Sequence, residues 1–208
     1  MRGSLSHDLE DELRDLVVRG DLVVGRVNEV HLAKQLEVSR TPLREALTRL
    51  AGEHFLDAQP RIGFFVPALS VADMEQLYAI RAKLDPWALE LAGIPDRAAI
   101  EALDAKNDEL RTAAGDPDRV IALDDEWHLA LLARCPNPVL IELIHQMIWR
   151  TRRYEHAYFR ATRNVGNAYA EHRKLIAALK KGDLREACKR LEANMTSAIP
   201  ALAKWLQR

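Results

Sequence analysis

The sequence predicts a mainly α-helical chain. An N-terminal winged helix-turn-helix over residues 1–68 is followed by an all-α antiparallel helical bundle over residues 69–208. Apolar residues recur at helical spacing along most of the chain, and this is the first observation that favours the fold class. The second is that one hairpin pattern, near residues 55–66, interrupts the helices and no strand pattern follows it. A chain of 208 residues is also long enough for two small domains that each bury a core.

The composition is that of a globular protein, and it excludes several classes. Hydrophobic residues make up 48% of the chain and charged residues 29%, with a net charge of −1. Any contact with nucleic acid must therefore come from a local basic patch. Cys135 and Cys188 form neither a disulfide framework nor a zinc-ribbon spacing. No signal peptide and no apolar run of about 20 residues is present, so we expect a cytoplasmic protein with no membrane partner.

The N-terminal part contains the elements of a winged helix in order. Gly20 is expected to close the first helix, while Asn28 and Ser39 are expected to cap the next two. A turn at Gln59-Pro60-Arg61 joins the strands of a small hairpin. The expected segments are helices over 5–19, 28–36 and 39–52 and strands over 55–58 and 62–66.

The third of these helices has an apolar side and a basic side. Its other faces carry four polar side chains, Arg40, Thr41, Arg44 and Arg49. A short helix that begins with Arg-Thr and exposes guanidinium groups suits insertion into the major groove of DNA. At the hairpin tip, Gly63 beside Arg61 allows the backbone to approach a phosphate wall or the minor groove.

Two stretches, Val38–Leu50 and Pro60–Val66, closely resemble the helix-turn-helix and wing of the GntR family of bacterial transcription regulators. The resemblance covers roughly residues 9–68 and implies a homodimer, usually a repressor, that binds a pseudo-palindromic operator DNA. It also implies operator contacts by Arg40, Thr41 and Arg44, with support from Arg49, Arg61 and Gly63. Val24-Gly25 stands where the family has Pro-Gly, and His54 stands at a usual glycine.

From Leu69 onward the sequence predicts only amphipathic helices. Ser70 is a good N-cap for the first of them, and Pro200 is expected to kink the last. Short links at Gly and Pro residues separate the helices, as in an antiparallel bundle. The expected spans are 71–93, 97–114, 117–134, 138–160, 167–181 and 183–205.

Several polar residues fall on the apolar faces of these helices. Asp124 and His128 are four residues apart and share one face, and His172 lies in line with apolar residues of its own helix. Arg81 and Asn194 interrupt apolar stripes in the same way. Because buried polar groups are costly unless satisfied, their convergence predicts a polar cavity. A carboxylate with imidazoles suits a divalent transition metal such as zinc, nickel or manganese.

This part of the chain resembles the FCD-type ligand-sensing domain of FadR-type GntR regulators, over roughly residues 70–205. The matching stretches are Leu77–Asp85, Asp124–His128, Asn137-Pro138, Glu171–Ile176 and Gly182-Asp183. The resemblance implies a metal held by one Asp and three His, which helps to bind a small carboxylate effector.

Asp124, His128 and His172 match three of the metal ligands that this resemblance implies, and Asn194 stands at the position of the third histidine. An amide oxygen is a weaker and harder ligand than imidazole. A weak site, a site tuned to another metal and a metal-free site therefore all stay open. The candidate effector-binding residues are Arg81, Asp124, His128, His172 and Asn194.

The cations of the bundle admit more than one interpretation. Arg81 is either an effector clamp or a buried ion-pair partner of Asp85 or Glu90. An arginine run is expected to form a mostly solvated face, with one or two members reaching the cavity to hold a carboxylate bidentately. Its members are Arg150, Arg152, Arg153, Arg160 and Arg163.

Two other functions compete with a regulator that senses a small carboxylate. Asp125-x-x-His128 and Glu142-x-x-His145 have the spacing of di-iron helical bundles, which would indicate a metal-binding bundle enzyme. That interpretation lacks bridging glutamates and leaves the winged helix without a role. A fatty-acyl sensor, found in one branch of the family, is disfavoured because the Asp-x-x-x-His pattern indicates a small polar effector. We therefore expect a regulator that is not an enzyme.

Overall fold

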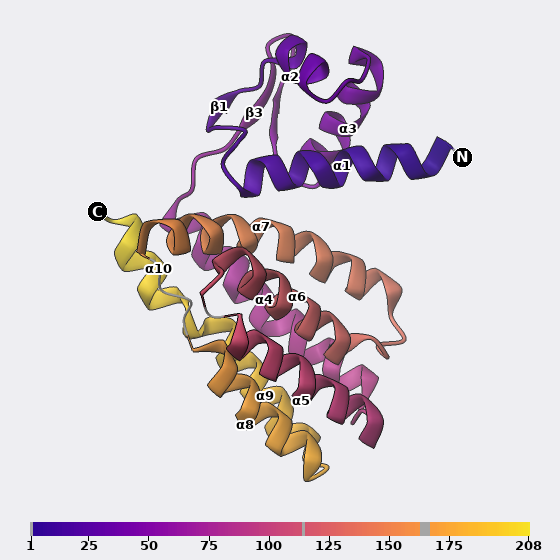
Figure 1. Cartoon of the computed structure of the whole chain (residues 1–208), viewed down its shortest axis with the longest axis vertical. Coiled ribbons are helices and arrows are strands. Elements are labelled where there is room, and N and C mark those ends of the chain that lie inside the picture. The colour runs from indigo at the N-terminus through magenta and orange to yellow at the C-terminus, as the bar shows by residue number, and fades with distance from the viewer. Residues whose placement is uncertain (1, 114, 163–166) are drawn as a thin grey trace. The chain divides into compact units, whose positions relative to one another are not determined.

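The computed structural model describes residues 2–113, 115–162 and 167–208. The chain divides into two compact units, an N-terminal unit, Met1–Leu69, and a C-terminal unit, Ser70–Arg208. Figure 1 shows both units, with the described strands confined to the first. Arg163 of the arginine run and residue 114, where one predicted helix ends, lie outside the described residues.

The N-terminal unit consists of three helices and a small antiparallel sheet. The helices are α1 (Arg2–Val18), α2 (Glu29–Gln35) and α3 (Arg40–Gly52). The strands are β1 (Gly25–Arg26), β2 (Asp57–Gln59) and β3 (Gly63–Val66), in the order β1-β3-β2. Both α1 and α2 pack against α3, whose apolar side is buried completely. The predicted winged helix-turn-helix is therefore present.

The strand β1 differs from the sequence prediction, which contained only the hairpin of β2 and β3. Gly25 pairs with Val66, and Arg26 pairs with Phe65. A strand of two residues has no alternation of apolar and polar positions, so only its partner strand defines it. Its consequence is that Arg26 lies next to the wing.

Both helices of the helix-turn-helix end at a residue with left-handed backbone. Glu37 follows α2 with a φ of 54°, and His54 follows α3 with a φ of 56°. The His54 amide donates to the Ala51 carbonyl at 3.1 Å, and the Phe55 amide donates to the Leu50 carbonyl at 2.9 Å. This is the Schellman arrangement, in which glycine is usual at the left-handed position. His54 thus occupies a position where a side chain costs conformational energy.

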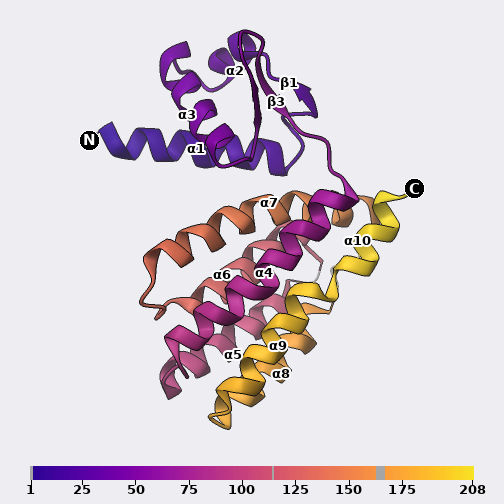
Figure 2. The same cartoon turned by 180° about the vertical axis from the view of Figure 1, so that it is seen from behind.

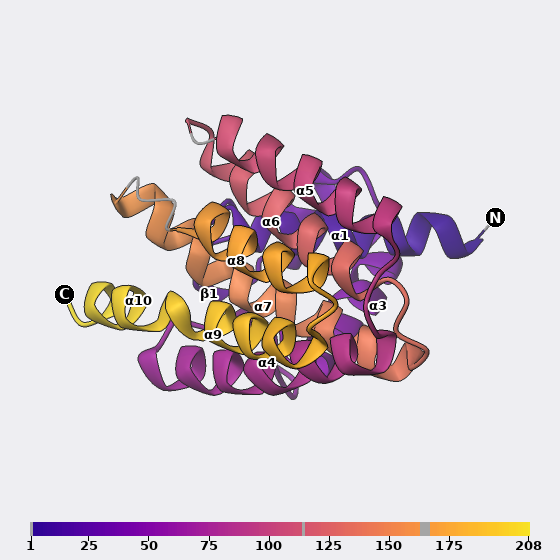
Figure 3. The same ribbon diagram turned by 90° about the horizontal axis from the view of Figure 1, so that it is seen from below.

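The C-terminal unit is a bundle of helices. They are α4 (Val71–Ala92), α5 (Arg97–Thr112), α6 (Pro117–Leu132), α7 (Pro138–Thr162), α8 (Ala168–Lys180), α9 (Leu184–Ser197) and α10 (Ile199–Leu206). Figure 3 shows α4, α9, α8 and α5 side by side in that order, and each contacts the next. In Figure 2, α4 runs beside α9, and α4 also packs against α6, α7 and α10.

The last predicted helix is divided in the structure. The prediction was one helix over 183–205 with a kink at Pro200, but α9 ends at Ser197 and α10 begins at Ile199. Pro200 lies in the first turn of α10, where its missing N–H would have no partner in any case. The chain therefore restarts a helix at the proline instead of bending through it.

The core of the C-terminal unit draws on α4 to α9 and includes Trp127, which is fully buried. Ser70 caps α4 as predicted, because its hydroxyl accepts a hydrogen bond from the Asp73 amide at 3.1 Å. The predicted fold class, a winged helix-turn-helix followed by an all-α bundle, is confirmed. Among the described helices, none combines the length and the hydropathy required to cross a bilayer.

Candidate functional site

The exposed face of α3 carries the predicted DNA-contacting residues. Arg40, Thr41 and Arg44 lie at its N-terminal end and are exposed, while Leu43, which precedes Arg44, is buried. Arg40, Arg44, Arg61 and Gly63 line one hollow between α3 and the wing, with a volume of about 480 Å³. Arg49 is on another side of α3 and donates to Glu10 on α1. The structure therefore gathers four of the six predicted residues around one hollow.

Two further residues of this hollow were missed from the sequence. Arg26 on β1 and Glu29 on α2 both line it. The Arg44 guanidinium lies 3.3 Å from a Glu29 carboxylate oxygen, so α3 and α2 share an ion pair. Gly63 has a φ of 127°, and a Cβ at this position would lie 3.4 Å from the other Glu29 oxygen. Backbone conformation and close approach both favour glycine here.

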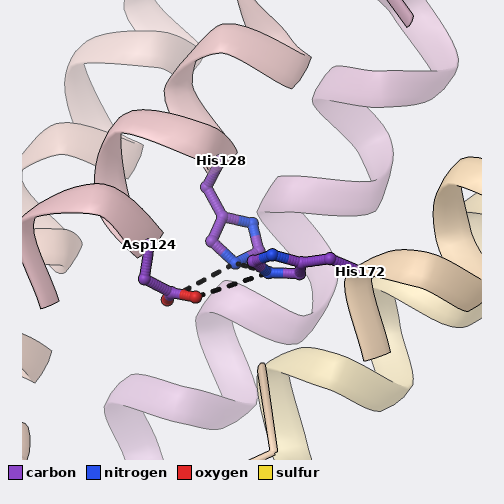
Figure 4. A group of neighbouring side chains, drawn as sticks. All are labelled: Asp124, His128 and His172. Carbon is purple, nitrogen blue, oxygen red and sulfur yellow. Dashed lines mark hydrogen bonds and ion pairs between the residues drawn. The ribbon is translucent and has the colours of Figure 1, made fainter. Parts of the chain in front are cut away.

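In the C-terminal unit, Asp124, His128 and His172 form an Asp–His–His cluster (Figure 4). Asp124 and His128 come from α6 and His172 from α8. The two Nε2 atoms are 3.4 Å apart, and the Asp124 oxygens lie 3.7 Å from His128 Nε2 and 3.4 Å from His172 Nε2. Ligand atoms about 2.0–2.1 Å from a tetrahedral metal lie roughly 3.3 Å from one another. The spacing of the cluster therefore fits one metal ion.

The ionisation of the cluster also suits a metal. Burial lowers the pKa of His128 well below its ordinary value and lowers the pKa of His172 to about 3, so both rings are neutral at pH 7. Burial, together with the nearby charges of Glu155 and Asp125, raises the pKa of Asp124 well above its ordinary value. A cation between these groups would favour the carboxylate and bind the ring lone pairs.

His172 is held by neighbours that the sequence analysis did not identify. Its Nδ1 lies 3.1 Å from Asn107 Oδ1, and the Asn107 amide nitrogen donates to the Tyr169 carbonyl at 3.1 Å. That donation fixes the orientation of the Asn107 amide, so Asn107 Oδ1 accepts a hydrogen bond from His172 Nδ1–H. The lone pair of His172 is then on Nε2, which faces Asp124. The Trp127 ring stacks on His172 with centroids 3.7 Å apart and an interplanar angle of 7°.

A cavity of about 440 Å³ opens beside this cluster, within the usual size range of small-molecule sites. Asp124, Arg81 and Asn194 line it, so three of the five predicted effector residues reach it. His128 and His172 are buried and are not among the residues that line it. The remaining wall is largely apolar and includes Val120, Ile121, Phe159, Met195, Ala201 and Leu202.

Asn194 bonds to Glu171 from α8, and this contact was not predicted. Its Nδ2 donates to a Glu171 carboxylate oxygen at 2.6 Å, and Ser197 Oγ donates to the same oxygen at 3.0 Å. Among the described residues, the buried Asn194 Oδ1 and Asp124 Oδ1 accept no hydrogen bond. The cavity therefore presents two acceptors that a ligand or a metal could use.

Of the two interpretations of Arg81 that the sequence left open, the structure shows the buried ion pair. Its guanidinium donates to Asp85 and to Thr151, each at 3.1 Å, and Arg81 is 3% exposed. It nevertheless lines the cavity. The ion pair with Asp85 is thus present and holds a positive charge at the cavity wall.

The arginine run is not the solvated face that the sequence suggested. Arg150 and Arg152 donate to carboxylates of neighbouring helices, and the Arg152 bond to buried Asp125 is 2.7 Å long. Arg153 is 9% exposed, and Arg160 is the exposed member among the four described. None of these four lines the cavity. The expectation was wrong because helical spacing does not show where a partner helix supplies acids.

The geometry contradicts the di-iron enzyme interpretation. Asp125 turns toward Arg152, whereas Asp124 faces His128. Glu142 and His145 are both exposed. The two Asp/Glu-x-x-His motifs therefore do not converge on one centre.

Comparison with protein families assigns both units. The model described as bacterial regulatory proteins of the gntR family matches residues 5–66, and the FCD domain model matches residues 76–197. Among curated proteins, the HTH-type transcriptional regulator McbR of Escherichia coli is 30% identical over 193 residues, which span 89% of this chain and 86% of McbR. The Nta operon transcriptional regulator of Aminobacter aminovorans is 35% identical over 148 residues, 63% of this chain and 68% of that protein.

Solved structures agree with this assignment. E. coli McbR superimposes with a TM-score of 0.83 at 28% identity, over 97% of this chain and 98% of that chain. A GntR-type regulator from Rhodococcus sp. RHA1 shares the fold with a TM-score of 0.77 at 23% identity, over 97% and 98% of the two chains. The chain therefore belongs to the GntR family of bacterial transcription regulators, with a C-terminal FCD domain, and is a regulator and not an enzyme.

Proposed function

We propose that this chain is a homodimeric repressor that binds a pseudo-palindromic operator in the bacterial cytoplasm. A small carboxylate effector in the C-terminal cavity alters the affinity for that operator. One observation carries the proposal: an exposed basic recognition helix occupies one compact unit, and a cavity with an Asp–His–His cluster occupies the other. Effector binding can act on DNA binding only through its different affinity for two conformations of the dimer.

In this proposal the N-terminal end of α3 enters the major groove. Arg40, Thr41 and Arg44 contact base edges and phosphates, because they are exposed together at the start of that helix. Arg61 and Gly63 place the wing against the backbone. Arg49 supports the docking less directly, since it also joins α3 to α1 through Glu10.

The Asp–His–His cluster would hold zinc, nickel or manganese through Asp124, His128 and His172. The bound ion would supply a positive charge that attracts the carboxylate of the effector. Arg81 adds a second positive charge at the cavity wall, although Asp85 already pairs with it. Asn194, in place of a third histidine, offers its free amide oxygen either to the ion or to the effector.

An exposed apolar surface supports the proposed homodimer. On α4, the side chains of Ile80, Trp87 and Leu91 are 46%, 48% and 40% exposed. On α7, which packs against α4, Val139 and Leu143 are also exposed. Large exposed apolar side chains on helices that contact each other are typical of a protein–protein interface. We assign this α4–α7 surface to a second copy of the chain, because one short recognition helix gives too little specificity alone.

Operator binding is the experiment that tests the proposal. A randomised DNA library enriched on the wild-type protein supplies the probe, and fluorescence anisotropy measures affinity. Arg40→Ala and Arg44→Ala should each weaken binding by about 10-fold or more, since a good base contact contributes about 1–3 kcal/mol.

Arg97→Ala is the matched control, because Arg97 is an exposed arginine on α5 in the other unit. Its affinity should stay within about 2-fold of the wild type. Retention of sequence-specific binding by both α3 variants, with unchanged thermal unfolding, would contradict the proposal.

A further inference from the structure

The cavity wall carries several acidic side chains, and a ligand whose only charged group is a carboxylate does not account for them. Among the described residues of its wall, Asp124, Glu155 and Glu171 are acids and Arg81 is the one strong base. Arg81 already pairs with Asp85. If Asp124 serves a metal, Glu155 and Glu171 form no ion pair with any described residue of the cavity wall, and Arg81 acts on Glu155 only at longer range.

Glu171 is fixed with its carboxylate at the cavity wall. One of its oxygens accepts from Asn194 Nδ2 at 2.6 Å and from Ser197 Oγ at 3.0 Å. Because the Asn194 amide nitrogen must donate to the carboxylate, the assignment of its two ends follows from chemistry. The Asn194 Oδ1 is then the free end, and it is buried without a partner among the described residues.

Glu155 presents a second acceptor from α7. Its carboxylate accepts from the Tyr78 hydroxyl at 2.9 Å, and both residues line the cavity. A carboxylate has about four acceptor positions, so each of these glutamates keeps capacity for further donors. The cavity thus has acceptors from α7, α8 and α9 that the protein itself leaves partly unused.

A ligand with only a carboxylate would meet like charge at these groups, and a buried acceptor without a donor is costly. An ammonium group supplies three donors and a positive charge. We propose that the effector of this regulator is an amino-acid-like zwitterion. Its ammonium is bound by Glu171 and the Asn194 amide oxygen, and its short apolar chain lies against Ile121, Met195 and Leu202. This inference rests on the proposed effector-binding role of the cavity.

Three probes of equal chain length separate the contributions of the ammonium group and the carboxylate group to binding. They are 2-aminopentanoate, pentanoate and pentylamine, each titrated calorimetrically into the full-length protein with and without Mn²⁺. We expect 2-aminopentanoate to bind at least about 10-fold more tightly than either of the others. Pentanoate that binds as tightly as 2-aminopentanoate would overturn the proposal, and so would a failure of all three probes to bind.

Two variants identify the ammonium site. Glu171→Gln and Asn194→Ala should each weaken the binding of 2-aminopentanoate by about 10-fold or more. The affinity for pentanoate should change by less than about 2-fold. Glu142→Gln, an exposed glutamate on α7, is the matched control and should change neither. Equal losses for both ligands would overturn the assigned role of these residues.

The test also separates this inference from the proposed function. Wild-type protein that binds its selected operator but none of the probes would leave the regulator in place and reject the zwitterion. Protein that binds 2-aminopentanoate but no specific DNA would support the zwitterionic ligand and contradict the proposed function as a repressor.

Discussion

Individual polar contacts determine what the Asp–His–His cluster can bind. His172 turns one ring nitrogen toward Asp124 because Asn107 engages the other, and Asn107 is in turn held by the Tyr169 carbonyl. Asn107 is completely buried, so no water competes for this bond. An imidazole fixed in this tautomer offers a lone pair at Nε2 without reorganisation.

At the residue scale we therefore predict that Asn107→Ala weakens metal binding by about 10–100-fold, because it frees the tautomer and orientation of His172. Competition with a chromophoric chelator measures the affinity for zinc, nickel and manganese. His172→Ala shows the affinity that remains when a ligand of the site is removed. Glu101→Gln is the neutral control, because Glu101 is exposed on α5, the helix that also carries Asn107. Wild-type affinity in the Asn107 variant would show that this hydrogen bond has no role in metal binding.

The elements of the N-terminal unit are positioned by how their helices end. The left-handed residues Glu37 and His54 turn the chain sharply after α2 and α3. The turn after α2 brings α3 into place as the recognition helix, and the turn after α3 starts the wing. Neither position has glycine, so each turn carries a steric cost that the surrounding packing overcomes.

At the element scale we predict that His54→Gly stabilises the protein by about 0.5–1 kcal/mol. Glycine removes the steric cost of the left-handed backbone at this position, and part of that gain is lost because glycine makes the unfolded chain more flexible. Urea unfolding measures the change. Ala51→Gly, within α3, should instead destabilise by about 1 kcal/mol, since glycine is a poor helix residue. A destabilised His54→Gly variant would mean that the imidazole makes contacts worth more than the strain.

At the scale of the whole molecule, the proposed regulation needs two copies of the chain. The α4–α7 surface assigned to the partner includes Trp87, and large aromatic side chains dominate interface energetics. The same α4 lines the cavity proposed for the effector through Tyr78 and Arg81. A ligand in the cavity and a partner on the outer face would thus act on one helix.

Trp87→Glu should therefore convert a dimer into a monomer in light-scattering measurements and weaken operator binding, since the two half-sites would no longer be bound together. Ala105→Glu adds the same charge to an exposed position of α5 and should leave the dimer intact. A dimeric Trp87→Glu variant would place the interface elsewhere.

Local patterns explain why much of the fold and part of the site were predictable. Asp124 and His128 lie one turn apart on a single helix, so their shared face follows from spacing alone. His172 lies on another helix, and its place in the cluster was inferred from the family resemblance. Long amphipathic helices were likewise evident, because periodicity accumulates over many residues.

What the sequence did not predict depends on contacts between distant elements. The strand β1 exists only through its pairing with β3. Asn107 and Glu171 gained their roles from partners on other helices. Arg152 is indistinguishable in spacing from an exposed arginine until Asp125 is seen beside it. Such partnerships are set by tertiary packing, to which a single sequence gives no direct access.

The ion pair between Arg44 and Glu29 has a consequence for how the regulator would search a chromosome. An arginine that already faces a carboxylate gains less from an arbitrary phosphate, because contact with DNA must first displace Glu29. Genomes offer about 10⁶–10⁹ competing sites, and the time spent on them limits how soon the operator is found. Glu29 would lower the affinity of Arg44 for DNA at every site where no base edge compensates for the lost ion pair. The protein would then spend less time bound to non-specific sites, and few copies per cell would suffice to occupy the operator.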